Sequence, residues 1–387
     1  MKLALIRRQF AATGGAELYL QRLLGALSSA GHELHLFAER WSAPLSGVTM
    51  HPIMVQGSRA QKPLAFARAV EAAVQPQTFD CVLSFERTVR QDIYRAGDGL
   101  HRVWLERRRQ FAPWWKKPLI GWGAFHRNML RLEAQTLDPA RTRAVIVNSD
   151  MVRREIGQHF RFPEERIHLV RNGVDVDRFR SGKRAETRRR FGFKDEDLVL
   201  LFVGSGWERK GLKYLLRALD HLDLRQGIET LSRDLTGGVG VPGGLTRRSV
   251  RLLVVGKGSR PAFVPLGCVF AGAIADVENA YAAADVFAFV PIYEPSANVV
   301  VEALAAGLPV ITSVQNGASE WVEEGINGSV LEDPSDTEAV VKAISFWASR
   351  PFRARPVDPD RLSLERNVNE TLRVVQFVMD QKKAERS

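Results

Sequence analysis

The sequence predicts an α/β protein of two domains, each a parallel sheet between layers of helices. Short apolar runs alternate with segments of helical periodicity along most of the 387 residues, which is typical of such sheets. The alternation pauses near residue 175 and then resumes in the same form. The length also exceeds the size at which one hydrophobic core keeps growing. We therefore expect two domains that face a central cleft.

The first half opens with an apolar strand, a loop with two glycines and a segment of helical spacing. Further apolar runs of strand length and amphipathic segments follow. The expected elements are strands at 2–7, 32–39, 80–86 and 142–150 and helices at 64–74 and 151–160. Asn172 and Gly173 then supply a turn, so we place the first domain at residues 1–175.

The second half repeats this pattern, which predicts two Rossmann-like domains, the second at residues 176–360. The expected elements are strands at 197–205, 250–258, 268–274, 286–291 and 308–313 and helices at 211–222, 276–284 and 295–306. An amphipathic helix at about 361–387 is expected to pack back on the first domain. We interpret the glycine-rich stretch at 226–248 as an exposed insertion.

The composition is that of a globular protein with an anionic partner. A formal net charge of +11 indicates nucleic acid, an anionic membrane or a phosphorylated substrate, and charge alone leaves these open. The two cysteines lie far apart in apolar stretches, so buried free thiols in a reducing cytoplasm are expected. No signal peptide or spanning segment is evident, so membrane association should be peripheral.

Two carboxylates surround the helix expected near residue 300. Glu294 precedes it and Glu302 lies eight positions later, a little over two turns, so both approach one face. The amides of Ala297, Asn298 and Val299 would be unpaired donors at the positive helix end, which suits a pyrophosphate. Glu302 could accept hydrogen bonds from a ribose and Glu294 from sugar hydroxyls. The alternative is a helix cap at Glu294 and a solvated helix residue at Glu302.

Two cations follow the strand expected at 197–205. Arg209 and Lys210 lie between this strand and the next helix, at the edge where doubly wound sheets bind ligands. Such cations can neutralise the charge that develops on a departing nucleoside diphosphate. Taken alone, the two residues could also be incidental charges on a solvated loop.

These motifs together resemble the retaining family 4 glycosyltransferases with the GT-B fold, and among them the bacterial lipopolysaccharide core glucosyltransferases of type I. The resemblance covers nearly the whole chain, and its joint order and spacing are specific. It rests on ATGGAE with Gly14 and Gly15, VGSGWERKG with Gly204, VVGKG with Gly256, the spacing of Glu294 and Glu302, NGVD at 172–175 and AAGLPVITS at 305–313.

The resemblance implies roles for individual residues in donor binding. Arg209 and Lys210 would hold the donor diphosphate, Glu302 would hold the ribose, and Glu294 the transferred sugar. Glycines allow the backbone to approach a ligand closely. The other donor-binding positions implied are Gly14, Gly15, Gly204, Gly256, Ala297, Asn298 and Val299.

Asp98 falls where these enzymes carry a side chain near the sugar and the attacking hydroxyl. Many relatives have histidine there, and His101 is the rival candidate in this chain. Asp98 completes the catalytic set implied by the resemblance, with Arg209, Lys210 and Glu294. Retention should proceed by front-face attack in which the leaving phosphate helps to deprotonate the acceptor, so Glu294 should not be the nucleophile.

Residues 101–131 combine four of the chain's eight tryptophans with interleaved arginine and lysine. Tryptophan favours the membrane interface, and each basic residue near an anionic leaflet contributes about 1 kcal/mol. We prefer membrane docking to a nucleic-acid platform or a plain helix pair, since nucleotide-sugar chemistry already accounts for phosphate affinity. The docking residues would be Trp104, Trp114, Trp115, Lys116, Lys117 and Trp122.

The sequence thus predicts an enzyme that moves glucose from UDP-glucose to a heptose of the lipopolysaccharide inner core. It would meet its lipid A core acceptor at the inner face of the cytoplasmic membrane, with no nucleic acid as partner. The alternatives are another family 4 transferase using UDP-GlcNAc, UDP-galactose or GDP-mannose on a different glycolipid or polysaccharide, a membrane scaffold that only binds nucleotide sugars, and a nucleoside-phosphate-binding regulator. No Asp-x-Asp motif follows a strand, so neither a metal nor another cofactor is expected.

Overall fold

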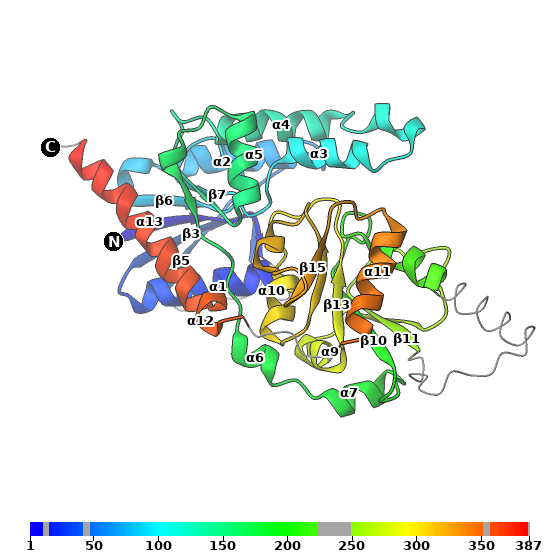
Figure 1. Cartoon of the computed structure of the whole chain (residues 1–387). Helices are drawn as coiled ribbons and strands as arrows, with labels where there is room; N and C mark the ends of the chain where they lie inside the picture. The colour runs from blue at the N-terminus through cyan, green and yellow to red at the C-terminus, as the bar shows by residue number, and fades with distance from the viewer. Residues whose placement is uncertain (11–14, 42–46, 223–248, 351–356, 386–387) are drawn as a thin grey trace, which may run out of the picture. The chain divides into compact units, whose positions relative to one another are not determined.

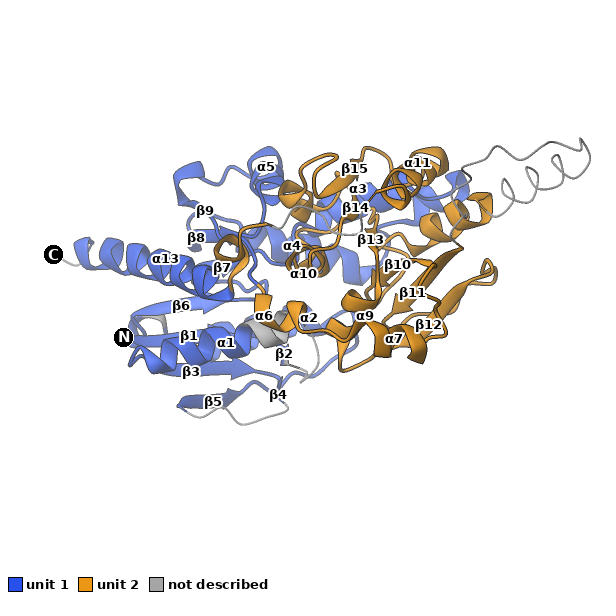
Figure 2. Ribbon diagram, turned by 60° about the horizontal axis from the view of Figure 1, so that its bottom comes forward, with its two compact units in different colours: residues 1–173, 364–387 blue, residues 174–363 orange. Residues whose placement is uncertain are grey.

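The structure is a computed structural model that describes residues 1–10, 15–41, 47–222, 249–350 and 357–385. The chain divides into two compact units, which Figure 2 distinguishes by colour. Unit 1 comprises Met1–Gly173 and Leu364–Ser387, and unit 2 comprises Val174–Ser363. Each unit is a parallel sheet flanked by helices (Figure 1). Gly14 and the glycine-rich stretch at 226–248 lie outside the described residues.

The sheet of unit 1 has the strand order β5-β3-β1-β6-β7-β8-β9, and all neighbours are parallel. Its strands are β1 (Lys2–Ile6), β3 (Glu33–Ala38), β5 (Val48–Pro52), β6 (Cys81–Ser84), β7 (Gln91–Arg95), β8 (Thr142–Val147) and β9 (Ile167–Leu169). A separate parallel pair joins β2 (Gln9–Phe10) to β4 (Arg40–Trp41). The chain order reverses between β1 and β6, which is where doubly wound sheets bind ligands.

Helices cover both faces of this sheet because successive strand residues point to opposite sides. On one face, Leu23 of α1 (Gly15–Ser29) and Val375 of α13 (Leu364–Ala384) share a core with Leu5. On the other face, Phe66 of α2 (Lys62–Ala73) packs with Ile6. The unit also contains α3 (His101–Gln110), α4 (Ala124–Thr136), α5 (Asp150–His159) and the 3-10 turns η1 (Pro76–Thr78), η2 (Trp114–Leu119) and η3 (Glu164–Arg166).

The sheet of unit 2 has the order β12-β11-β10-β13-β14-β15 and is also parallel, with its reversal between β10 and β13. Its strands are β10 (Leu198–Val203), β11 (Val250–Val255), β12 (Cys268–Gly272), β13 (Val286–Phe289), β14 (Val310–Ser313) and β15 (Gly328–Leu331). The flanking helices are residues 212–222, α6 (Val176–Arg180), α7 (Arg184–Arg190), α9 (Val277–Ala283), α10 (Asn298–Ala305), η4 (Gly317–Trp321), α11 (Thr337–Ala348) and α12 (Pro359–Leu362). None of the helices described is both long enough and apolar enough to cross a membrane.

Candidate functional site

The candidate donor site of unit 2 lies at the carboxyl ends of β10 and β13. These neighbouring strands flank the point at which the strand order reverses. Arg209 and Lys210 follow β10, and Glu294 follows β13. Two adjacent cations and a carboxylate that is distant from them in sequence are therefore brought together at the topological switch point of the sheet.

Glu294 bridges the two cations. Nζ of Lys210 lies 3.3 Å from Oε2 of Glu294, and Nη2 of Arg209 lies 3.6 Å from Oε1. Nε of Arg209 also donates to the carbonyl oxygen of Tyr293 at 2.8 Å. The Glu294 side chain is only 15% exposed, so these charges attract more strongly than a surface pair would. The group of three keeps a surplus positive charge, which suits it to an anionic ligand.

Two glycines allow the ends of β10 and β11 to approach each other. Gly256 has a φ of +124°, and a Cβ there would overlap the carbonyl oxygen of Gly204. A Cβ on Gly204 would lie 2.7 Å from Cδ of Lys210. The structure thus gives both positions a role in backbone packing and in making room for Lys210, beside the donor contact that the sequence predicts.

The loop that carries Glu294 is held by the turn after β14. The N–H of Glu294 donates to the carbonyl oxygen of Gln315 at 2.8 Å, and the N–H of Gly317 donates to the carbonyl oxygen of Glu294 at 2.8 Å. The buried Asn316 accepts through Oδ1 from the N–H groups of Ala297 and Ala318, both at 3.1 Å. Sequence reasoning missed Asn316, although an asparagine at the start of a helical turn is a capping signal.

The interpretation of Ala297 as an unpaired amide donor is wrong. Its N–H is occupied by Asn316, and its backbone is extended, with φ −72° and ψ 112°. The helix α10 consequently begins at Asn298, three residues later than expected. Asn298 and Val299 lie in its first turn, so the anion site inferred from three amides loses one of them.

Asn316 gives a direct test of how the loop is positioned. Nδ2 of Asn316 donates to Oγ1 of Thr312 at 3.0 Å, so Asn316→Ala should remove three hydrogen bonds and leave buried N–H groups unpaired. We expect the free energy of unfolding to fall by about 1–3 kcal/mol, measured by urea titration. The control Asn316→Asp keeps both of the hydrogen bonds that Oδ1 accepts, so its free energy of unfolding should fall by less. Equal losses in the two variants would contradict this account.

Glu302 is fixed by a tyrosine. Oε2 of Glu302 accepts a hydrogen bond from the hydroxyl of Tyr281 in α9 at 2.7 Å. Burial raises the pKa of Glu302, although the Tyr281 bond and the charge of Arg178 act in the opposite direction. The carboxylate is therefore oriented, and it retains a second oxygen that can accept from a ligand hydroxyl.

Family models match both halves of the chain. Residues 13–178 match the model described as Glycosyltransferase Family 4, and residues 197–349 match Glycosyl transferases group 1. The chain belongs to the family 4 glycosyltransferases. This confirms the family inferred from the motifs.

The chain is similar to curated proteins and solved structures. It is 23% identical over 349 residues to the lipopolysaccharide glucosyltransferase WaaG of Escherichia coli K12, covering 84% of this chain and 83% of WaaG. It is 25% identical over 258 residues to an uncharacterized glycosyltransferase of Methanocaldococcus jannaschii, covering 61% of this chain but only 60% of that relative.

The fold matches two crystal structures. A WaaG structure superposes with a TM-score of 0.72 at 20% identity, covering 95% of this chain and 94% of the other. HepE of Anabaena, solved in complex with UDP and glucose, gives a TM-score of 0.64 at 17% identity, covering 100% and 98%. These likenesses confirm the predicted GT-B fold.

In unit 1, the predicted acceptor-side residues follow β7. Asp98 is exposed in a turn, and His101 begins α3 with Nε2 3.0 Å from Nδ1 of His126. Burial, with the charges of Arg87 and His126, lowers the pKa of His101 to about 4. His101 is therefore neutral near pH 7.

Glu86, which sequence reasoning did not identify, lies at the switch point of unit 1. Its Oε1 accepts from the N–H of Arg8 at 3.3 Å and lies 3.4 Å from Nη1 of Arg7. Burial raises the pKa of Glu86, and the charge of Asp98 adds to this, whereas Arg7 and Arg8 lower it. The carboxyl ends of β1, β6 and β7 thus gather charged side chains, as a ligand site in a doubly wound sheet would.

The tryptophan-rich segment of unit 1 is well exposed. The exposed fractions of Trp114, Trp115 and Trp122 are 82%, 56% and 80%. Nζ of Lys116 lies 4.7 Å from the centre of the Trp115 ring, and Lys117 is exposed beside it. Trp104 differs, because it is half-buried on α3.

Proposed function

We propose that this transferase is a retaining enzyme that moves glucose from UDP-glucose to a heptose of the lipopolysaccharide inner core. The observation that carries the proposal is the group formed by Arg209, Lys210 and Glu294 at the switch point of unit 2. The likeness to WaaG over most of both chains supports the acceptor class. The UDP and glucose bound by HepE support the donor.

The chemistry follows from the charges of the group. The donor diphosphate would lie against Arg209 and Lys210, which supply positive charge where the leaving group develops negative charge. Glu294 would then accept hydrogen bonds from the sugar hydroxyls, and the second oxygen of Glu302 would accept from the ribose. We propose that these two cations do the work for which other transferases use a metal ion.

In the transfer step, an acceptor hydroxyl oxygen bonds to the anomeric carbon on the face that the diphosphate leaves. The bond from that carbon to the phosphate oxygen breaks, and the hydroxyl proton passes to the departing phosphate oxygen. Attack from the leaving-group side retains the configuration without a covalent intermediate. We assign Asp98 to the position near the acceptor hydroxyl.

Release of UDP from UDP-glucose tests the proposal. The acceptor is heptosylated lipid A core from a truncated mutant, and controls omit the acceptor or add EDTA. We expect UDP only when acceptor is present, with no loss in EDTA. Turnover of another nucleotide sugar in place of UDP-glucose would reassign the donor, and no turnover of any would reject this enzyme activity.

We also propose that the transferase docks peripherally on the anionic inner face of the cytoplasmic membrane. The docking surface comprises Trp114, Trp115, Lys116, Lys117 and Trp122. Exposed indole rings beside ammonium groups fit the interface between acyl chains and anionic headgroups. This surface excludes Trp104, because that ring is half-buried.

Replacing Trp114, Trp115, Lys116 and Lys117 together with alanine should weaken binding to phosphatidylglycerol vesicles by more than about tenfold, since each lysine alone contributes about 1 kcal/mol. Vesicle sedimentation measures this, and UDP-glucose affinity should stay unchanged. The matched control is Phe263→Ala, Leu266→Ala, Lys194→Ala and Lys342→Ala, which removes two apolar and two lysine side chains that are exposed on unit 2. Vesicle binding that falls equally in the control would contradict the assignment.

A further inference from the structure

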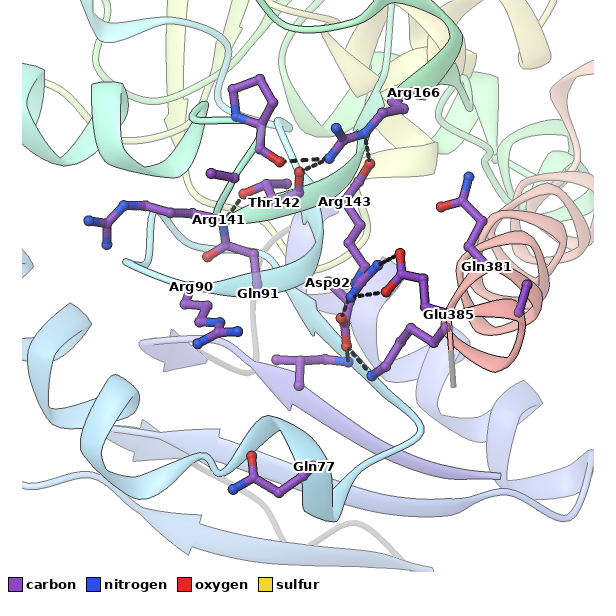
Figure 3. Close-up of a pocket in the computed structure, with 15 residues that line it drawn as sticks. Gln77, Arg90, Gln91, Asp92, Arg141, Thr142, Arg143, Arg166, Gln381 and Glu385 are labelled. Carbon is purple, nitrogen blue, oxygen red and sulfur yellow. Dashed lines mark hydrogen bonds and ion pairs between the residues drawn. The ribbon is translucent and has the colours of Figure 1, made fainter. Parts of the chain in front are cut away.

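A cavity of about 720 Å³ lies in unit 1, and its lining includes no residue assigned above to the donor site or the docking surface (Figure 3). Its walls are the starts of β6, β7 and β8, residues 139–141 before β8, and the last turn of α13. Glu86 and Asp98 follow the carboxyl ends of β6 and β7, so the cavity occupies the opposite edge of the sheet. Its volume is within the usual range for small-molecule sites.

Cationic side chains predominate in the lining. The ionisable lining residues are Arg90, Arg141, Arg143, Arg166 and Lys382, with Asp92 and Glu385 as the carboxylates. Two of the cations are neutralised inside the cavity. Nζ of Lys382 lies 2.9 Å from Oδ2 of the buried Asp92, and Nη1 of Arg143 lies 2.6 Å from Oε1 of Glu385.

Three arginines remain as a surplus. Arg90 is exposed just before β7. Nε of Arg141 lies 3.5 Å from Oδ2 of Asp138, and both side chains are partly exposed, so this contact has a small energy. Arg166 donates to the carbonyl oxygens of Pro139, Thr142 and Arg143, which carry no net charge. Burial, with repulsion from Arg143, lowers the pKa of Arg166. An anion in the cavity would relieve that repulsion.

Glu385 already shows how an anion engages this cavity. Its two oxygens accept from Nη1 and Nη2 of Arg143 at 2.6 and 2.9 Å, the two-pronged geometry with which arginine also binds phosphate. The Glu385 side chain is 58% exposed and lies in the last residues described. Figure 3 shows this carboxylate, Arg143 and Asp92 converging, with Arg90 set apart from this group and Arg141 pointing away from it.

We infer that this cavity is a second binding site, distinct from the donor site, for a phosphate-bearing anion. The anion would contact Arg143 and Arg90, with Arg141 adding attraction from the rim. Glu385 would act as an internal competitor, because its carboxylate occupies the guanidinium edge that the phosphate needs. The source of the phosphate is either a soluble anion or a lipid headgroup.

Titration calorimetry with inorganic pyrophosphate tests the site in protein carrying Arg209→Ala and Lys210→Ala, which removes the proposed donor site. In this background, Arg90→Gln with Arg141→Gln should weaken binding about tenfold, because two cations are lost. Glu385→Gln should strengthen it severalfold, because the competitor loses its charge. The matched control is Arg68→Gln with Arg154→Gln, two exposed arginines on α2 and α5, which should change affinity little.

The control at Arg68 and Arg154 separates the loss of the cavity arginines from a general loss of positive charge. The inference is overturned if the background protein binds neither pyrophosphate nor phosphatidic acid vesicles, if the control weakens binding as much as the cavity variant, or if Glu385→Gln strengthens binding to neither of them. Thermal melts of each variant verify folding. In a second arm, the same variants are sedimented with phosphatidic acid vesicles. If Glu385→Gln strengthens binding to the vesicles but not to pyrophosphate, the ligand of this site is a lipid phosphate and not a soluble anion.

Discussion

Replacing both Arg209 and Lys210 with alanine is expected to lower kcat/KM for UDP-glucose by at least about a hundredfold. Both cations meet Glu294 where the strand order of unit 2 reverses, so the variant loses the positive charge that would oppose the leaving diphosphate. It also leaves the mostly buried carboxylate of Glu294 without its two partners. Both effects lower kcat/KM. Acceptor-dependent UDP release, measured over a range of donor concentrations, gives the constant.

Two further variants separate these effects. Glu294→Gln removes the carboxylate and keeps the cations, so UDP binding should be retained while transfer falls. Arg217→Ala removes an exposed arginine from the following helix and should leave kcat/KM close to that of the wild type. If the Arg209 and Lys210 variant turned over UDP-glucose at the wild-type rate, the donor site would have to be sought elsewhere.

The sequence predicted strands such as β1 from their apolar runs and missed β7, in which polar side chains are buried. β1, β10 and β13 are apolar and were expected, but β7 reads QDIYR and was not. All five of its residues are buried. Asp92 can be buried because Lys382, on a helix 290 positions later, forms an ion pair with it. Gln91 can be buried because its Oε1 accepts a hydrogen bond from the hydroxyl of Thr88. Periodicity cannot reveal a strand that depends on partners so distant in sequence.

The same limit applies to the site. The grouping of Arg209 and Lys210 with Glu294 was predictable, because residues that follow neighbouring parallel strands meet at one sheet edge. The role of Asn316 was not, because it depends on the backbone N–H of Ala297, 19 positions earlier. That contact is also why the prediction of a free Ala297 amide failed. Local helix rules describe which amides lack a partner within the helix, and tertiary contacts decide which stay available.

Gly211→Ala is expected to lower the free energy of unfolding by at least about 3 kcal/mol and to weaken UDP binding with it. Gly211 follows Lys210 with a φ of +78°. A Cβ there would overlap the carbonyl oxygen of Val290 and lie 2.6 Å from its carbonyl carbon. Because the N–H of Ile292 also donates to the carbonyl oxygen of Arg209 at 3.0 Å, the added methyl group must push apart the two segments that carry the cations and Glu294.

Gly206→Ala is the matched control, because it has nearly the same backbone conformation without the overlap. Its φ is +74°, and a Cβ there would have no heavy atom within 4 Å. Its free energy of unfolding should fall only by the conformational cost of a positive φ, about 1–2 kcal/mol. Urea unfolding of the two variants then isolates the contact with Val290 as the difference between their free energies. Equal losses would mean that the backbone at Val290 yields to the methyl group, and UDP affinity should then be equal in the two variants as well.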